Sequence, residues 1–130
     1  MEIEVFTLCD AAADYQGRLS ILGIFDTVFA NNLPSIHPAC TIAVRLRFDA
    51  AEAGYHRLAL HIVDTDGSAI IPALQGEFNV QINNPNDLQA AANLVLNLQG
   101  VQFSKYGEHA VKLLIDNRVE RTIPFWVKHP

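Results

Sequence analysis

The sequence predicts an all-β protein, an antiparallel two-sheet β-sandwich of about seven or eight strands, immunoglobulin-like or C2-like. Three observations support this fold class. Several stretches alternate apolar and polar residues with a period of two, turn residues separate them, and no stretch keeps the period of about 3.6 residues that a helix needs. Because side chains alternate across a strand, each such stretch has one buried face and one solvated face.

The N-terminal part contains two predicted strands. Residues 3–8 alternate, and the small and acidic residues at 10–14 break the pattern. Residues 18–30 form the longest apolar stretch, with large apolar side chains on both faces. A strand that is covered on both faces belongs in the centre of a sheet, so we expect this strand to be central, with a bend or a bulge at Gly23.

The clearest strand covers residues 41–48, after a proline-containing loop at 31–38. Its buried face is predicted to hold four residues, Ile42, Val44, Leu46 and Phe48. A strand at 57–63 follows. Residues 64–67 end in Asp-Gly, which is a strong signal for a hairpin turn, and a further strand is predicted at 76–82.

The C-terminal part continues the same pattern. After an asparagine-rich loop at 83–87, residues 89–92 suit one helical turn, and residues 93–99 alternate as a strand. The last two strands are predicted at 109–116 and 122–128, where they form a closing hairpin.

Composition indicates a single globular domain. A chain of 130 residues, half of them hydrophobic, can bury its own core. The net charge of −5 argues against a nucleic-acid or anionic-membrane partner. No apolar run is long enough to cross a membrane, and the acidic N-terminal residues are unlike a signal peptide, so we expect a cytoplasmic protein. Cys9 and Cys40 are expected to be half-buried, reduced thiols.

Two groups of residues resemble a known family. The first joins Leu-Cys-Asp-Ala at 8–11 to Gly-Arg-Leu-Ser-Ile-Leu-Gly-Ile-Phe at 17–25. The second consists of residues 93–98, 106–107, 114–116 and 123–125. Together they resemble a widespread bacterial family of small proteins of unknown function, and the closing hairpin is similar to the last strands of immunoglobulin-like sandwiches. The resemblance implies a sandwich over nearly the whole chain and brings no activity or catalytic residues.

No pattern of reactive residues predicts an enzyme or a metal site. Asp64 and Asp66 could share a calcium ion, but the residues that follow lack the glycine and glutamate that an EF-hand loop requires. The histidines lack the spacing of zinc ligands. There is no Gly-x-Ser-x-Gly turn and no glycine-rich phosphate loop. We therefore expect a non-enzymatic protein with no metal and no cofactor.

The candidate interaction site is a basic patch of four residues, Arg45, Arg47, Arg57 and His61. It assumes that residues 44–48 and 57–62 pair as a hairpin, which would bring these side chains together. Like charges side by side are unfavourable, so something must offset them. Acidic neighbours such as Glu77 are one explanation, and an acidic partner surface or an anionic ligand is the other.

The leading functional hypothesis is an interaction or structural module that binds an unknown protein partner or a second copy of itself, as a homodimer. It is supported by large apolar residues on predicted exposed faces, Val63, Val95, Leu114 and Trp126. The alternative is a small-ligand site for a carbohydrate or an anion, formed by the asparagine-rich loops at 31–38 and 83–92. A concave site that joins these loops would favour the alternative, and loops at opposite ends would exclude it.

Overall fold

The computed structural model describes every residue from Met1 to Pro130 and confirms an all-β protein with two sheets. It has nine strands, more than predicted, and its one helical element is a single 3₁₀ turn, so no helix spans a membrane. The elements in chain order are β1 (Glu2–Tyr15), β2 (Arg18–Ile24), β3 (Thr27–Phe29), β4 (Ser35–Asp49), η1 (Ala50–Glu52), β5 (Gly54–Val63), β6 (Leu74–Val80), β7 (Gln89–Phe103), β8 (Gly107–Ile115) and β9 (Arg118–Lys128).

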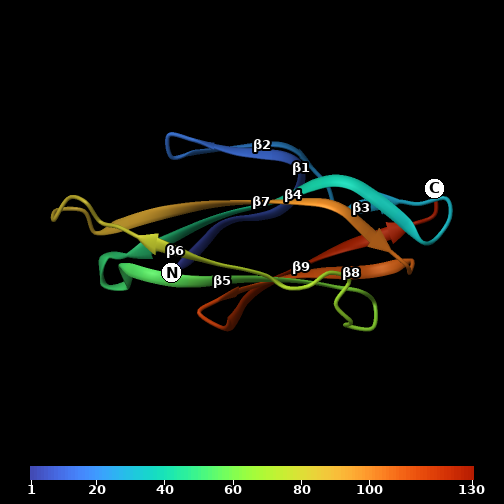
Figure 1. The fold of residues 1–130 in the computed structure, drawn as a ribbon. Coiled ribbons are helices and arrows are strands. Elements are labelled where there is room, and N and C mark those ends of the chain that lie inside the picture. Colours follow the sequence, from blue (N-terminus) through green and yellow to red (C-terminus); the bar gives the residue numbers. More distant parts are fainter.

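The strands form a four-stranded sheet A with the order β2-β1-β4-β7 and a five-stranded sheet B with the order β3-β9-β8-β5-β6 (Figure 1). Every pair is antiparallel except one. The short strand β3 runs parallel to β9, with Val28 opposite Val127. The prediction of a wholly antiparallel protein is therefore wrong at this edge, because the chain leaves sheet A after β2 and joins sheet B alongside its last strand.

The core lies between the two sheets and contains 21 buried residues. The predicted inward face of β4 is confirmed, since Ile42, Val44 and Leu46 are completely buried. Leu60 on β5 and Leu113 on β8 are also completely buried, on the inner face of sheet B. Each such side chain contributes about 1.5–3 kcal/mol by leaving water, so this shared layer is the main force that holds the sheets together.

The chain crosses from sheet A to sheet B at η1. Here the carboxylate of Glu52 accepts hydrogen bonds from the backbone N–H of Asp49 and from the N-terminal amine of Met1, both at 3.0 Å. Hydrogen bonds from Asp49 and from the terminal amine lower the pKa of Glu52. This carboxylate therefore fixes the point where β4 ends and β5 begins in the opposite sheet.

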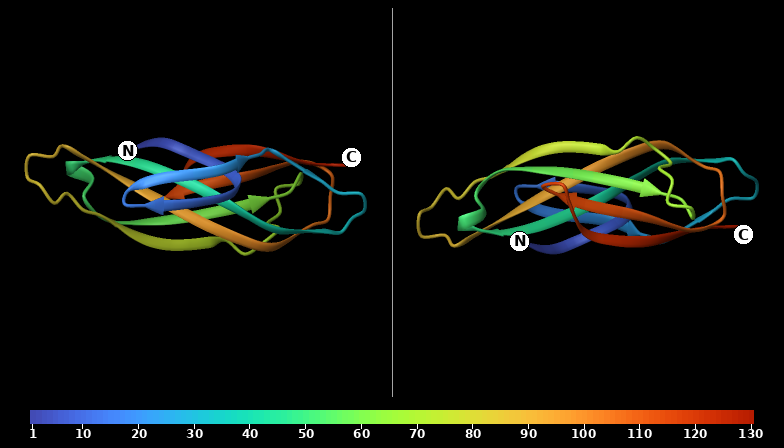
Figure 2. Two further views of the ribbon diagram at one scale, coloured as in Figure 1. Left: turned by 90° about the horizontal axis from the view of Figure 1, so that it is seen from above. Right: turned by 90° about the horizontal axis from the view of Figure 1, so that it is seen from below.

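A β-hairpin folds back over the outer face of sheet A. Strand β1 pairs with β4 as far as Cys9 and then with β2. Residues 10–24, which we call the folded-back hairpin, form a third layer outside β4 and β7 (Figures 1 and 2). Its tip is held by Asn93 on β7, which donates to the carbonyl of Gly17 at 3.1 Å. The outward residues Thr41 and Ala43 of β4 are 3% and 0% exposed, as a covering layer requires.

Two glycines make this hairpin possible. Gly17, with φ +80°, follows Gln16, with φ +52°, in a two-residue turn in which both residues are left-handed. At the bend, Gly23 has φ +69°, and a Cβ there would lie 2.3 Å from an oxygen of Asp10. The predicted bend at Gly23 is confirmed, and only glycine fits it.

The predictions for the N-terminal strands need correction. Residues 10–14 do not break the first strand, because β1 continues through them and changes partner from β4 to β2. Residues 18–30 are not a central strand, because β2 lies at the edge of sheet A and β3 at the edge of sheet B. Their two apolar faces arise because one face of β2 covers sheet A and the other is exposed.

The later elements follow the prediction more closely. The Asp64 turn is confirmed, with the N–H of Gly67 donating to the carbonyl of Asp64 at 3.0 Å. The closing hairpin is confirmed as β8 and β9, joined at Asp116 and Asn117, which both have positive φ. The helical turn at 89–92 is wrong, because β7 begins at Gln89 and pairs with the end of β4 from there.

Candidate functional site

The structure divides the predicted basic patch between two sheets. Arg45 and Arg47 lie on β4, which pairs with β1 and β7. Arg57 and His61 lie on β5, which pairs with β6 and β8. The predicted hairpin between these strands is wrong, because both strands bury one apolar face and the chain crosses at η1 to place those faces against each other. The four residues therefore do not form one site.

On sheet A, a single carboxylate forms ion pairs with both arginines. Glu4 of β1 accepts from Nε of Arg45 at 2.8 Å and from Nε of Arg47 at 2.9 Å. Hydrogen bonds from Arg47 and then Arg45 lower the pKa of Glu4, and the same contact raises that of Arg47. Arg45 also donates to Asn93 at 2.8 Å, next to the tip of the folded-back hairpin. This cluster joins three strands, and it keeps one net positive charge because one carboxylate faces two guanidinium groups.

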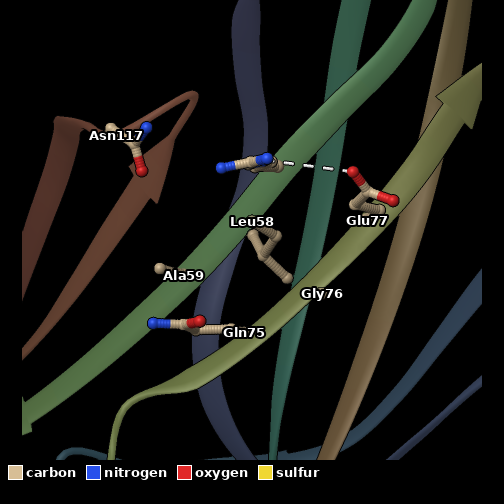
Figure 3. A pocket seen from close by; sticks show the side chains of 7 residues that line it. Leu58, Ala59, Gln75, Gly76, Glu77 and Asn117 are labelled. Carbon is tan, nitrogen blue, oxygen red and sulfur yellow. Dashed lines mark ion pairs between the residues drawn. The ribbon is translucent and has the colours of Figure 1, made fainter.

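On sheet B, Arg57 borders a shallow depression of about 410 Å³ (Figure 3). The hollow exists because Ala59 and Gly76 have small or no side chains where longer ones rise around them. Arg57 makes one long ion pair with Glu77, at 3.9 Å, so the predicted acidic neighbour is present. The rim offers the amides of Gln75 and Asn117 and no nucleophile, which suits polar contacts but not covalent chemistry.

A histidine that the sequence did not single out joins several elements near η1. Nδ1 of His56 lies 2.7 Å from Asp116, and Nε2 lies 2.6 Å from the carbonyl oxygen of Glu52. The ring stacks on Phe48 with a centroid distance of 4.7 Å. Burial alone would lower the pKa of His56, but the hydrogen bonds to Asp116 and Glu52 outweigh it and raise the pKa. Both ring nitrogens are occupied, so this histidine is a structural link.

The apolar surface that the sequence placed on several strands lies elsewhere. Of the predicted exposed residues, Val63 is buried at 8% exposure, and Val95, Leu114 and Trp126 are half-buried and spread over both sheets. The structure instead exposes Leu22 at 70% and Ile24 at 66%, both on β2. Sequence reasoning missed this surface because it assigned residues 18–30 to the centre of a sheet.

The two asparagine-rich loops lie at opposite ends of the molecule. In the register of β4 and β7, Ser35 is opposite Phe103 and Asp49 is opposite Gln89. One loop precedes β4 and the other precedes β7, so a strand length of about 45 Å separates them (Figure 1). A carbohydrate or anion site that uses both loops is excluded by this geometry.

Comparison with known proteins places the chain in a family. A model described as a family of unknown function, DUF6941, matches residues 4–128. The chain belongs to this family. No curated protein matches it. The DUF6941 match extends from β1 to β9 and so includes the folded-back hairpin.

The DUF6941 chain keeps its two thiols buried and unpaired. Cys9 is completely buried and its thiol donates to the carbonyl of Thr41 at 3.5 Å, while Cys40 belongs to the core between the sheets. Burial raises the pKa of both, to about 11 for Cys40. No three His, Cys, Asp or Glu side chains come together as metal ligands. The Asp64 turn instead pairs with Lys105, which contacts Asp64 at 3.5 Å.

Proposed function

We propose that this protein is a non-enzymatic interaction module that associates with a second copy of itself through the free edge of β2. One observation carries the proposal: β2 has no neighbour on one side, and it exposes Leu22 and Ile24 there. Soluble proteins rarely leave a strand edge both unpaired and apolar, because such an edge pairs with other chains.

The other edge strands are protected in ways that β2 is not. Strand β7, the second edge of sheet A, keeps its large apolar side chains buried or half-buried. Strand β3 has only three residues, and β6 carries Glu77 and a central glycine. Residues 19–24 of β2 contain no charge and no proline. Tyr15, at the end of the same hairpin, is also 68% exposed and enlarges the apolar area. The folded-back hairpin therefore offers the most exposed apolar edge of the molecule.

A second copy fits this edge by charge as well as by hydrophobicity. In an antiparallel pair of two β2 strands, a two-fold axis relates the copies, so each residue makes the same contact twice. Arg18 is the only charged residue of β2, and Asp26 follows the opposite end of the strand. In the antiparallel pair, Arg18 of one copy therefore lies near Asp26 of the other copy. The register that sets Arg18 opposite Asp26 puts Leu22 next to the axis, where it meets its own copy.

Light scattering coupled to gel filtration tests the proposal over a range of protein concentrations. We expect a dimer, and a strict monomer at high concentration would refute it. Leu22→Lys should shift the equilibrium to monomer, whereas Tyr55→Lys, at an equally exposed position on β5, should not. Arg18→Asp and Asp26→Arg should each weaken the dimer, and the two changes together should restore it.

Disulfide trapping tests the register. Leu22→Cys should form an intermolecular disulfide on oxidation because the two thiols face each other across the axis. Ile24→Cys is the matched control, since its thiol would lie opposite Ser20 and away from its own copy. The native thiols of Cys9 and Cys40 are buried and do not compete. Trapping at both positions, or at neither, would contradict the register.

The absence of catalysis is supported by how the reactive groups are used. Glu4 is held by two arginines, His56 by Asp116 and a carbonyl, and Asp64 by backbone N–H groups and Lys105. A general acid or base must be free to exchange a proton with substrate. A panel of hydrolase substrates should therefore give rates equal to those without protein.

The strand order favours an immunoglobulin-like sandwich. In that fold the second and fifth strands pair in one sheet, and the third, sixth and seventh form the other. Here β4 and β7 pair as those second and fifth strands do. Strands β5, β8 and β9 lie side by side, as the third, sixth and seventh strands do in that fold. The buried, unpaired thiols support the predicted cytoplasmic location, because such thiols suit a reducing compartment. The bacterial distribution of the family stays a prediction.

A further inference from the structure

The shallow depression on sheet B has a polar rim that the proposed contact through β2 does not use. Four polar side chains belong to this rim: Arg57 of β5, Gln75 and Glu77 of β6, and Asn117 of the turn between β8 and β9. Figure 3 shows Asn117 and Glu77 on opposite sides of β5. All four residues are exposed, so a solute can reach each of them from the surrounding water.

The polar groups of this rim are not used inside the protein. Arg57 pairs only with Glu77, and a separation of 3.9 Å is too long for a hydrogen bond. The side-chain amides of Gln75 and Asn117 make no hydrogen bond either, whereas the amide of Asn93 on sheet A bonds to the folded-back hairpin. One guanidinium group, one carboxylate and two amides are therefore free to bind a solute.

Backbone hydrogen bonds hold both walls of the depression in place. The N–H of Arg57 donates to the carboxylate of Asp116, and the N–H of Asp116 donates to the carbonyl of Arg57, both at 2.9 Å. Asp116 and Asn117 have φ values of +51° and +66°, so the turn is tight. On the other side, Arg57 is directly opposite Glu77 in the register of β5 and β6. The backbone therefore does not have to rearrange when a ligand binds.

The depression carries one charge of each sign. A ligand with only a negative charge gains from Arg57 and is repelled by Glu77, and the reverse holds for a ligand with only a positive charge. The two side chains are 69% and 65% exposed, so solvent screens their own pairing and little is lost when a ligand replaces it. A ligand with both charges on adjacent groups replaces this one long contact by two shorter ones.

We infer that this depression binds a free α-amino acid as a zwitterion, with its carboxylate on Arg57 and its ammonium group on Glu77. A guanidinium group holds a carboxylate through two parallel hydrogen bonds. The ammonium group has three donors, and the amide oxygen of Gln75 can accept a second of them. Ala59 lines the same depression and leaves room for a small ligand side chain.

The chemistry of the rim favours a free amino acid over a segment of a partner protein. Within a peptide chain the α-amino and α-carboxyl groups are joined in amide bonds, so no carbon carries both charges. The volume of about 410 Å³ lies within the range of small-molecule sites. The site does not include β2 and does not depend on the proposed dimer.

Nitrogen NMR tests the inference on the intact protein, with L-alanine as the probe and with acetate and methylammonium as probes of a single charge. We expect L-alanine to shift the Nε signal of Arg57 and the side-chain amide signals of Gln75 and Asn117 in a saturable way. One charge-assisted hydrogen bond is worth about a factor of ten in affinity, so each single-charge probe should bind about tenfold more weakly. Acetate or methylammonium binding as tightly as L-alanine would overturn the inference.

Exchanging the two charges tests the roles of the residues. Arg57→Glu should abolish the response to L-alanine, and Arg57→Glu combined with Glu77→Arg should restore it, because the ligand then binds in the reverse direction. Arg121→Gln is the matched control, since Arg121 is also exposed on sheet B but does not line the depression, and it should leave binding unchanged. No saturable shift with L-alanine would overturn the inference. So would a shift that survives Arg57→Glu, or a double variant that binds no better than Arg57→Glu alone.

Discussion

Replacing His56 by Phe should lower the free energy of unfolding more at about pH 6 than at about pH 9. His56 joins β5 to the β8–β9 turn through Asp116 and to η1 through the carbonyl of Glu52. Both partners only accept, so the ring donates both hydrogen bonds only when it is protonated. Phenylalanine keeps the stack on Phe48, so the variant removes the hydrogen bonds and little else.

The size of the effect follows from the two bonds. The bond to the Glu52 carbonyl contributes about 1 kcal/mol. Asp116 is half exposed at 50%, so solvent screens its pairing with His56 and the contribution is about 0.5–1 kcal/mol. His56→Phe should therefore cost about 2 kcal/mol near pH 6, or a fall in Tm of roughly 8 °C for a chain of this size.

The pH dependence has a definite sign. The pKa of His56 is raised in the folded protein, so its contribution is fully present below the unfolded value of about 6.5 and is lost as the pH rises through the folded value. Above that value the neutral ring still donates one bond. The difference between the wild type and His56→Phe should therefore fall by about half, to about 1 kcal/mol.

Urea denaturation at the two pH values measures this difference. His61→Phe is the control, because His61 lies on the same strand and has no side-chain hydrogen bond. Its effect should not depend on pH in the same way. A loss of stability in His56→Phe that is equal at both pH values would show that His56 is not charged in the folded protein, and the reasoning would fail.

Three further predictions concern packing and backbone shape. Gly23→Ala should lower the free energy of unfolding by more than 1 kcal/mol, because φ is +69° and its Cβ would strike Asp10, whereas Gly76→Ala should stay within about 0.5 kcal/mol in the same denaturation assay. Leu46→Ala should cost about 2–5 kcal/mol and Leu22→Ala less than about 0.5 kcal/mol, since their exposures are 0% and 70%; equal losses would contradict the assigned core. Neither Cys9 nor Cys40 should react with a thiol reagent in the folded protein, because burial raises both pKa values, and both should react in denaturant.

The period-two pattern correctly predicts the strands that have one face in the core and one face in solvent. The inward face of β4 and the closing hairpin of β8 and β9 follow from alternation, because each strand has one face in the core and one in solvent. Three alanines carry no alternation, so the sequence predicts a helical turn at residues 89–92. In the structure they continue β7, since β4 supplies hydrogen-bonding partners as far as Asp49.

Alternation cannot tell which sheet a strand joins. Strands β4 and β5 follow each other in the chain and show compatible patterns, so a hairpin between them looked natural. They face each other across the core instead, and the basic patch separates as a consequence. The carboxylate that offsets Arg45 and Arg47 is Glu4, which is distant in sequence, so local reasoning named only Glu77, the neighbour of Arg57.

The folded-back hairpin could not be predicted for the same reason, because alternation does not show where in a sheet a strand lies. Apolar residues on both faces of 18–24 suit a strand in the middle of a sheet, and they suit equally an edge strand that covers a sheet with one face. Gly23 and the Gln16-Gly17 turn decide between the two, because a left-handed residue mid-strand and a tight turn reverse the chain onto its own sheet.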